Sequence, residues 1–312
     1  MDELWRVMAD GGTLDVEVPR MPHSDAYNDP THVRYFTPVT FDYFSPGYGQ
    51  RFQMPCKPWV QTEKHATDSR IFVKMMPDRP KKSVVAGLTS IIIPCYILPD
   101  RNAELRVFTQ ECINALRQHT TNFELVIVDN GSPIDAQWLE SEADIYIRNE
   151  TNLGYPPAIN QGFRAATGEW LVAMNNDVTV TEDWLELMQA AWDSSVGAVS
   201  SHLISKSDSP PTGERKALTQ EAHWGTMFGS LWITRREVVE KVGYLDEEYE
   251  RGMYDDKDLW MRLSENGYKL MKAGWCWHIG NATWGKLPNQ KRIFFKNKER
   301  FETKWQAQLQ TS

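Results

Sequence analysis

From residue 83 onward, short apolar runs alternate with stretches whose apolar residues recur at helical spacing. Apolar runs of strand length, which predict buried strands, occur at residues 89–94, 125–128 and 145–147. Helical spacing, which predicts helices between and after these strands, occurs at residues 105–116, 158–166 and 184–192. Strands that alternate with helices predict an α/β fold with a mainly parallel sheet and helices on both of its faces.

One further apolar run, residues 170–174, leads directly into Asn175, Asn176 and Asp177. Polar side chains at the carboxyl end of a strand lie at the edge where open α/β sheets bind ligands. Asp177 could therefore hold a divalent cation, and a hard cation with open positions can bind a diphosphate. The simpler alternative is an Asn-Asn-Asp turn that only ends the strand.

The first 80 residues differ in kind from the rest, because they are rich in Pro, Tyr, Phe and Asp and contain only short strand-like pieces such as residues 13–18. Residues 75–82 have the composition of a linker. We therefore expect a small α+β module at residues 1–82 and a larger domain at residues 83–312.

Composition and charge narrow the class of protein. Of the 312 residues, 41% are hydrophobic, which is enough for an ordinary globular core. No apolar run approaches the ~18 residues of a transmembrane helix, and the amino terminus lacks the order of a signal peptide. The four scattered cysteines indicate free thiols in a reducing compartment. We expect a cytoplasmic protein, either free or peripheral to the inner face of a membrane.

The net charge of -8 argues against a broad nucleic-acid-binding surface and makes nucleic acid a less favoured partner. Basic residues nevertheless cluster near the carboxyl end, at Lys286, Lys291, Arg292, Lys296, Lys298 and Arg300. Such a cluster is usually the solvated face of a helix. The alternatives are contact with a phosphate-bearing acceptor or with an anionic membrane surface.

Other polar residues stand where strands end or helices begin. Asp129 follows the run at 125–128, and a carboxylate there can accept hydrogen bonds from a ribose or a uracil-type base, or simply form an Asx turn. Residues 152–154 and 160–162 contain glycines that let the backbone approach a ligand closely. Neither GxGxxG nor GxxxxGK[ST] occurs, which argues against dehydrogenases and P-loop enzymes.

Two acidic residues, Asp255 and Asp256, stand at the start of a predicted helix, in which Asp258 and Arg262 have the spacing of an ion pair. Carboxylates at a helix start can be caps. Clustered carboxylates also repel each other, which raises a pKa and suits a general base. His278 lies between aromatic residues and a glycine, and is either structural or a partner of a distant Asp on one cation.

In this order the motifs resemble glycosyltransferase family 2, whose members have the GT-A fold. The resemblance covers about residues 86–305 and is strongest to the bacterial and viral branch with many rhamnosyltransferase-like proteins. The matching stretches are residues 89–96, 126–132, 152–168, 171–178, 229–248, 255–263 and 278–281.

The resemblance implies a binding site for a nucleotide-sugar donor. The base and ribose would be held by Pro94, Tyr96 and Asp129, and the ribose and diphosphate by Asn152, Gly154 and Asn160. Gly229, with Ser230, Leu231 and Trp232, would form the floor beneath the sugar and the acceptor.

The same resemblance implies a metal site. Asn175, Asn176 and Asp177 occupy the DxD position of the family, where Asp177 would be the metal-side acid and Asn175 and Asn176 would contact the nucleotide-sugar donor. His278 matches a histidine that joins the metal in many relatives. The expected cation is Mn²⁺ or Mg²⁺. An amide replaces the first acid of DxD, and because an amide supplies no charge, it is open whether the metal is essential.

For catalysis, the resemblance implies inverting, single-step transfer from a UDP- or dTDP-sugar to an acceptor hydroxyl. Asp256 matches the catalytic base and Asp255 the Glu of the family's ED motif. The acceptor would be a glycan, a lipid-linked glycan or another hydroxyl compound. The alternative is a catalytically inactive GT-A domain that binds a sugar nucleotide or glycan, which the amides at 175 and 176 favour.

The amino-terminal residues 11–19 and 29–37 resemble the carboxyl-terminal part of a class I SAM-dependent methyltransferase. The glycine-rich SAM loop and its strand are not in the sequence, so a SAM site and a bifunctional enzyme are not expected. This resemblance implies a remnant that serves as a packing or acceptor-side module.

Overall fold

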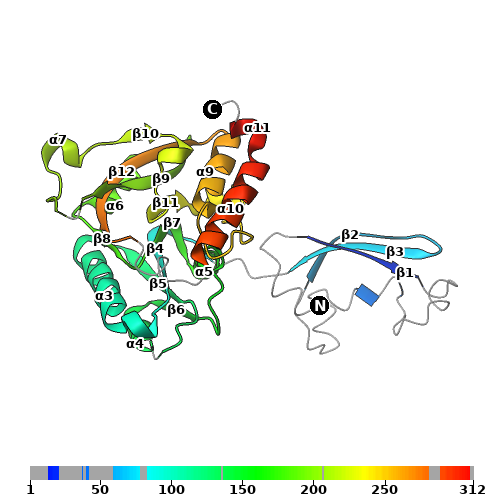
Figure 1. Cartoon of the computed structure of the whole chain (residues 1–312). Helices are drawn as coiled ribbons and strands as arrows, with labels where there is room; N and C mark the ends of the chain where they lie inside the picture. The colour runs from blue at the N-terminus through cyan, green and yellow to red at the C-terminus, as the bar shows by residue number, and fades with distance from the viewer. Residues whose placement is uncertain are drawn as a thin grey trace. The chain divides into compact units, whose positions relative to one another are not determined.

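The computed structural model describes residues 13–20, 37, 40, 41, 59–77, 83–134, 136–205, 207–280 and 289–309. The chain forms two compact units, residues 1–82 and 83–312 (Figure 1). In the described part of the chain, no helix combines the length and the apolar character needed to cross a bilayer.

The amino-terminal unit contains a three-stranded antiparallel sheet in the order β1-β3-β2. Its strands are β1 (Leu14–Pro19), β2 (Trp59–Ala66) and β3 (Arg70–Pro77). Trp59, Ile71 and Met75 are fully buried in its core. The predicted strand at 13–18 is therefore confirmed, but the predicted linker is wrong for residues 75–77, because they belong to β3 and Met75 packs inside. The second methyltransferase-like stretch lies outside the described residues, except for Thr37.

The larger unit is built on a nine-stranded sheet, in the order β10-β12-β9-β11-β7-β4-β5-β6, with β8 paired to β12. Its strands are β4 (Val85–Cys95), β5 (Phe123–Asp129), β6 (Ile145–Arg148), β7 (Gly168–Met174), β8 (Val178–Val180), β9 (Val196–Ile204), β10 (Gln220–Ala222), β11 (Leu231–Arg235) and β12 (Lys269–His278). The predicted strands at 89–94, 125–128, 145–147 and 170–174 are all present.

The parallel arrangement predicted from the sequence holds for β6, β5, β4 and β7, and β9 and β12 also pair in parallel. β11 runs antiparallel between β7 and β9, which makes the sheet mixed. Because β11 runs opposite to β7, its first residue, Leu231, pairs with the last residue of β7, Met174. This register brings the Gly229–Ser230 segment to the edge where Asn175 begins.

Helices cover both faces of this sheet (Figure 1). They are α3 (Asn102–His119), α4 (Trp138–Glu142), α5 (Tyr155–Ala165), α6 (Trp184–Ala190), α7 (Gly213–Lys216), α8 (Arg236–Val242), α9 (Asp255–Glu265), α10 (Gln290–Lys304) and α11 (Gln306–Leu309). Because successive strand residues point to opposite faces, Ile91 and Ile93 of β4 share a core with α3, α4 and α6. Ile92 shares the other core with α5, α8 and α9.

Two elements differ from the prediction in ways that matter for the site. α5 begins at Tyr155 and not at residue 158, because Pro156 and Pro157 fit the first turn of a helix, where no backbone N–H is needed. α10 packs beside α9, since Phe301 and Trp305 share a core with Met261 of α9 (Figure 1). Because Tyr254, directly before α9, packs against the same core, α10 lies close to the acidic start of α9.

Candidate active site

The end of β7 and the end of β12 meet at one edge of the sheet. β8 pairs antiparallel with β12 so that Val178 lies opposite His278. As a result, Nε2 of His278 lies 3.2 Å from Oδ1 of Asp177 and 3.2 Å from Nδ2 of Asn175. The backbone N–H of Gly280 donates to Oδ2 of Asp177 (3.0 Å). The structure thus brings the two predicted metal ligands, Asp177 and His278, together with Asn175, although His278 is about 100 positions from the other two in the sequence.

This donor set fits a divalent cation. A carboxylate oxygen, an imidazole nitrogen and an amide that can turn its oxygen inward are ligands that Mn²⁺ accepts, and the remaining positions would be open to a diphosphate. Among the described residues, no group of three or more His, Cys, Asp and Glu side chains could hold a metal ion. At this edge of the sheet, Asp177 and His278 are two such side chains, and the third polar side chain is the amide of Asn175.

Asn176 is separated from its two neighbours. Its Nδ2 donates to Oγ1 of Thr109 in α3 at 2.9 Å, and its side chain is buried. Asn175 and Asp177 face His278, whereas Asn176 faces the helix layer. In the structure Asn176 is a packing residue, and its predicted contact with the donor has no support in these contacts.

Asp255 and Asp256 occupy the first turn of α9. A Cβ at Gly229 would lie only 2.5 Å from Oδ2 of Asp256, so this carboxylate rests directly against the glycine backbone. Burial is the main cause that raises the pKa of Asp255 well above its usual value, and the charge of Asp256 raises it further. Burial also raises the pKa of Asp256. A carboxylate with a raised pKa is a better proton acceptor.

The metal-site residues and the acidic pair are connected through the Gly229–Ser230 segment. The backbone N–H of Asn175 donates to the carbonyl of Ser230 (2.9 Å), and the Tyr155 hydroxyl donates to the carbonyl of Gly229 (3.3 Å). Burial and then the charges of Asp255, Asp256 and Asp177 raise the pKa of Tyr155. Tyr155 therefore lies among the acids of both groups.

Sequence reasoning missed Tyr155 as a site residue, whereas it predicted Ser230 as part of the floor beneath the sugar and the acceptor. Oγ of Ser230 is buried and has no hydrogen-bond partner among the described residues. The available signal for Tyr155 was its position, directly after the Asn152–Gly154 motif.

The predicted donor loops are joined by Asn130, a residue that sequence reasoning also passed over. Its Nδ2 donates to the carbonyl of Gly154 (2.9 Å) and to Oδ1 of Asn152 (3.2 Å), and its Oδ1 accepts from the backbone N–H of Leu153 (3.1 Å). Gly154 has φ +100°. The loop after β5 and the start of α5 are therefore one connected unit.

Asp129 lies at this edge, next to the end of β4, where Pro94 and Tyr96 are half-buried. Its carboxylate is fully buried and accepts hydrogen bonds from the Tyr146 hydroxyl (3.1 Å), from the backbone N–H of Ser132 (3.0 Å) and from Arg148. Since about half of the Arg148 side chain is exposed, a nucleoside approaching Asp129 would first meet Arg148.

Asn160 has both of its polar groups occupied within the protein. Nδ2 donates to the carbonyl of Leu245 and to Oε1 of Glu247, each at 2.8 Å, and Oδ1 accepts from the N–H of Leu245 (3.1 Å). These bonds hold the segment after α8 against α5. A direct contact of Asn160 with the donor would require them to be exchanged.

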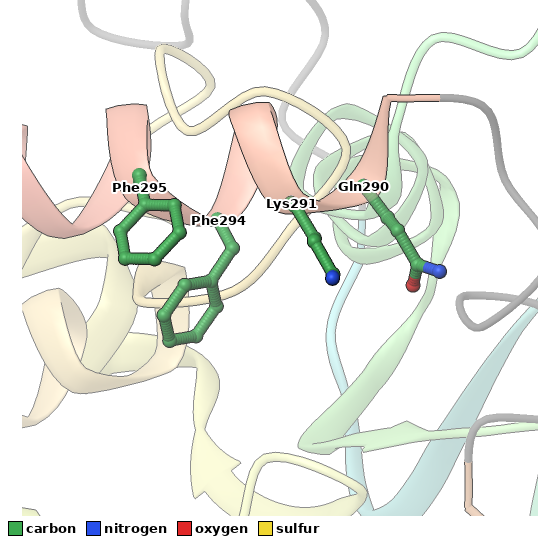
Figure 2. A pocket seen from close by; sticks show the side chains of 4 residues that line it. All are labelled: Gln290, Lys291, Phe294 and Phe295. Carbon is green, nitrogen blue, oxygen red and sulfur yellow. The ribbon is translucent and has the colours of Figure 1, made fainter.

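A pocket lies beside the start of α10, lined by Gln290, Lys291, Phe294 and Phe295 among the described residues (Figure 2). Its lining includes none of the predicted site residues. Several basic residues of α10 pair with acids of the segment before α9: Arg292 and Lys296 with Glu250, and Arg300 with Asp246. The cluster is therefore partly neutralised by acids of the same protein, while its Lys286 lies outside the described residues.

Comparison with known proteins identifies the family. The sequence model of glycosyl transferase family 2 matches residues 90–243. The segment of residues 90–243 therefore belongs to glycosyltransferase family 2. The matched segment contains the ends of β4, β5 and β7, the start of α5 and the Gly229–Ser230 segment.

The chain also aligns with parts of two curated proteins. The chain is 26% identical over 184 residues to the uncharacterized glycosyltransferase EpsJ of Bacillus subtilis, an alignment that covers 52% of each protein. It is 27% identical over 214 residues to the O-antigen biosynthesis protein RfbC of Myxococcus xanthus, covering 58% of this chain and 16% of that protein. The chain thus spans about half or less of the length of these curated relatives.

Solved structures establish the fold. Residues 1–349 of TarS from S. aureus, crystallised with UDP-GlcNAc, match with a TM-score of 0.52 and 16% identity over 69% of this chain and 66% of that one. GalNAc-T7, crystallised with UDP, GalNAc and Mn²⁺, matches with a TM-score of 0.50 and 16% identity over 69% of this chain and 50% of that one. The family 2 domain therefore has the predicted GT-A fold.

Proposed function

We propose that the family 2 domain transfers a sugar from a nucleoside diphosphate to an acceptor hydroxyl, with inversion at the anomeric carbon. The observation that carries this proposal is the placement of two different acidic groups on one backbone segment. His278 contacts both Asp177 and Asn175, and the backbone N–H of Asn175 donates to the carbonyl of Ser230. On the same segment, Asp256 lies against Gly229.

Each group has a separate task in this reaction. Asp256 accepts the proton of the acceptor hydroxyl while that oxygen attacks the anomeric carbon, and its raised pKa favours this role. Asp255 is buried beside Asp256, and its own pKa is raised by that burial and by the charge of Asp256. Asp177, His278 and Asn175 would hold a divalent cation, Mn²⁺ or Mg²⁺, which when bound neutralises charge on the leaving diphosphate.

The donor would lie along the connected loops at the ends of β4 and β5. We assign the base and ribose to Pro94, Tyr96 and Asp129, and the diphosphate side to Asn152 and Gly154. A uridine donor is supported by the UDP-GlcNAc bound to TarS and the UDP bound to GalNAc-T7, and a dTDP-sugar would satisfy the same residues. The manganese in the GalNAc-T7 structure supports the choice of cation.

The name of RfbC supports a glycan or lipid-linked glycan as acceptor and a role in polysaccharide biosynthesis. Such a reaction uses cytoplasmic nucleotide sugars, so we place the protein in the cytoplasm or at the inner face of a membrane. Nucleic acid is a less favoured acceptor because of the net charge of -8.

The proposal is tested with the full chain by thermal unfolding in UDP, dTDP and GDP, each with and without Mn²⁺. A ligand at about 100 times its Kd stabilises the folded state by about 2.7 kcal/mol, which is a clear shift in Tm. We expect a Mn²⁺-dependent shift with UDP or dTDP. Release of nucleotide from the corresponding sugars then separates an enzyme from an inactive GT-A domain, which would bind the nucleotide but release none.

A further inference from the structure

The four residues directly before the acidic pair have an unusual backbone. Arg251, Gly252, Met253 and Tyr254 all have positive φ, at 57°, 102°, 73° and 72°. Residues with a side chain disfavour this left-handed region, at about 1–3 kcal/mol each, and keep it only where their surroundings hold them. Three of the four residues carry side chains, so the segment needs an external support.

That support comes from Asn297 of α10, which is fully buried. Its Nδ2 donates to the carbonyls of Gly252 (2.7 Å), Glu250 (3.0 Å) and Met253 (3.3 Å). Its Oδ1 has no hydrogen-bond partner among the described residues, so the donating end of the amide makes these contacts. The single side chain of Asn297, more than 40 positions later in the sequence, thus binds three backbone carbonyls of residues 250–253.

The same segment also touches the predicted donor side of the site. A Cβ on Gly154 would lie 2.9 Å from Cα of Arg251, and a Cβ on Gly252 would lie 3.1 Å from Cβ of Tyr155. The segment is therefore in contact with the start of α5 and with Asn297. Residues 152–154, which are predicted to bind the donor, are held by hydrogen bonds to Asn130, and these bonds involve no residue of α10.

We propose that Asn297 is a positioning residue for the acidic pair: it holds residues 250–254 in their left-handed path and thereby sets where Asp256 lies against Gly229. This inference rests on the proposed function, because it takes Asp256 as the base. It predicts that loss of the Asn297 amide lowers turnover while nucleotide binding, anchored through Asn130, changes little.

The test uses the full chain with Asn297→Asp, which keeps the size of the side chain and replaces its N–H donors with oxygens that face three carbonyls. Asn297→Ser is the second variant, should the first fail to fold. Ile293→Ala is the matched control, because Ile293 is buried on the same helix and only packs. Three quantities are measured: hydrogen exchange of residues 250–258, affinity for UDP with Mn²⁺, and nucleotide release from a panel of UDP- and dTDP-sugars.

For Asn297→Asp we expect exchange in residues 250–258 to become about tenfold faster, the change expected when a net stabilisation of about 1.4 kcal/mol is lost. Affinity for UDP should stay within about twofold, and nucleotide release should fall by about tenfold to a hundredfold, as expected for a displaced catalytic group. Ile293→Ala should lower Tm, but hydrogen exchange should not become faster in residues 250–258 specifically. At a temperature where this variant is folded, its turnover should equal that of the wild type.

The inference is overturned if both Asn297 variants exchange like the wild type, if they open the whole domain as Ile293→Ala does, or if the segment opens and turnover is unchanged. If the wild type releases no nucleotide from any sugar, the proposed function is what fails. The exchange measurement alone then supports or overturns the role of Asn297 in holding the segment.

Discussion

Asp256 is the residue on which catalysis depends in our proposal, and Asp256→Asn tests it directly. The amide keeps the shape of the side chain but cannot accept the proton, so transfer or hydrolysis should fall by at least about a hundredfold. Nucleotide affinity should be unchanged in the same thermal-shift assay. Wild-type turnover in this variant would leave Asp256 as no more than a part of the helix start.

The amide at residue 175 offers a gain-of-function test of the metal site. Asn175→Asp adds a negative charge beside Asp177 and His278, which should tighten Mn²⁺ binding in the presence of UDP by roughly tenfold. The matched control is Asn176→Asp, one residue along, whose carboxylate would be buried against Thr109. It should leave Mn²⁺ affinity unchanged and lower the free energy of unfolding by about 1–3 kcal/mol. Equal effects at the two positions would contradict the site.

Asp255 gives a prediction for stability against pH. Its pKa is raised in the folded state, so the folded state holds this proton more tightly than the unfolded state, and stability is lost as pH rises through the folded pKa. Asp255→Asn should therefore raise the free energy of unfolding at pH 7, by about 1.4 kcal/mol for each pKa unit relieved, and the gain should shrink toward pH 4.

The control for this effect is Asp193→Asn. Hydrogen bonds from the Ser195 side chain and backbone lower the pKa of Asp193. Ionised Asp193 therefore stabilises the folded state at neutral pH, and Asp193→Asn should lower the free energy of unfolding there. Urea unfolding at pH 4 and pH 7 separates the two variants. A loss of stability at pH 7 in Asp255→Asn would contradict a raised pKa of Asp255 in the folded state.

At the start of α5, a glycine is required both by its own backbone conformation and by a neighbouring segment. Gly154 has φ +100°, and any Cβ there would meet the backbone of Arg251. Gly154→Ala should therefore lower the free energy of unfolding by more than backbone strain alone, with about 1–3 kcal/mol added by the collision, and should weaken UDP binding.

Gly267→Ala is the control for strain, because Gly267 has φ +79° and a Cβ added there would have nothing within 4 Å. It should lower the free energy of unfolding by about 1–2 kcal/mol and leave UDP binding unchanged. Equal losses in the two variants, measured by urea unfolding, would show that the contact with Arg251 is unimportant.

At the scale of the domain, Asp258 ties α9 to the carboxyl-terminal helices. Its carboxylate is fully buried and accepts hydrogen bonds from Arg262 (2.9 Å) and Trp305 (2.9 Å), with Nζ of Lys304 at 2.7 Å. Asp258→Ala leaves these donors without their partner and should lower the free energy of unfolding by about 3–5 kcal/mol. Glu302→Ala, which breaks the exposed pair with Lys298, should change it by no more than about 0.5 kcal/mol. Similar changes in both variants would contradict this view of α10 and α11.

The sequence by itself determined the βα order, the helices on both faces of the sheet and the ion pair of Asp258 with Arg262. These features are local: periodicity reports which face of an element is buried, and spacing of four residues places two side chains on one helix face. It also predicted that Asn175, Asp177 and His278 belong together, on the strength of a family resemblance.

Only the tertiary structure decided which of the polar residues actually meet. It turned Asn176 into the helix layer, covered Asp129 with Arg148, occupied Asn160 within the protein, and brought Tyr155 among three acids. It also set Asn297 of α10 against the backbone that precedes Asp255. The physical reason is that such contacts depend on the order of strands in the sheet and on which helix packs beside which. No periodicity within a single element records either of these.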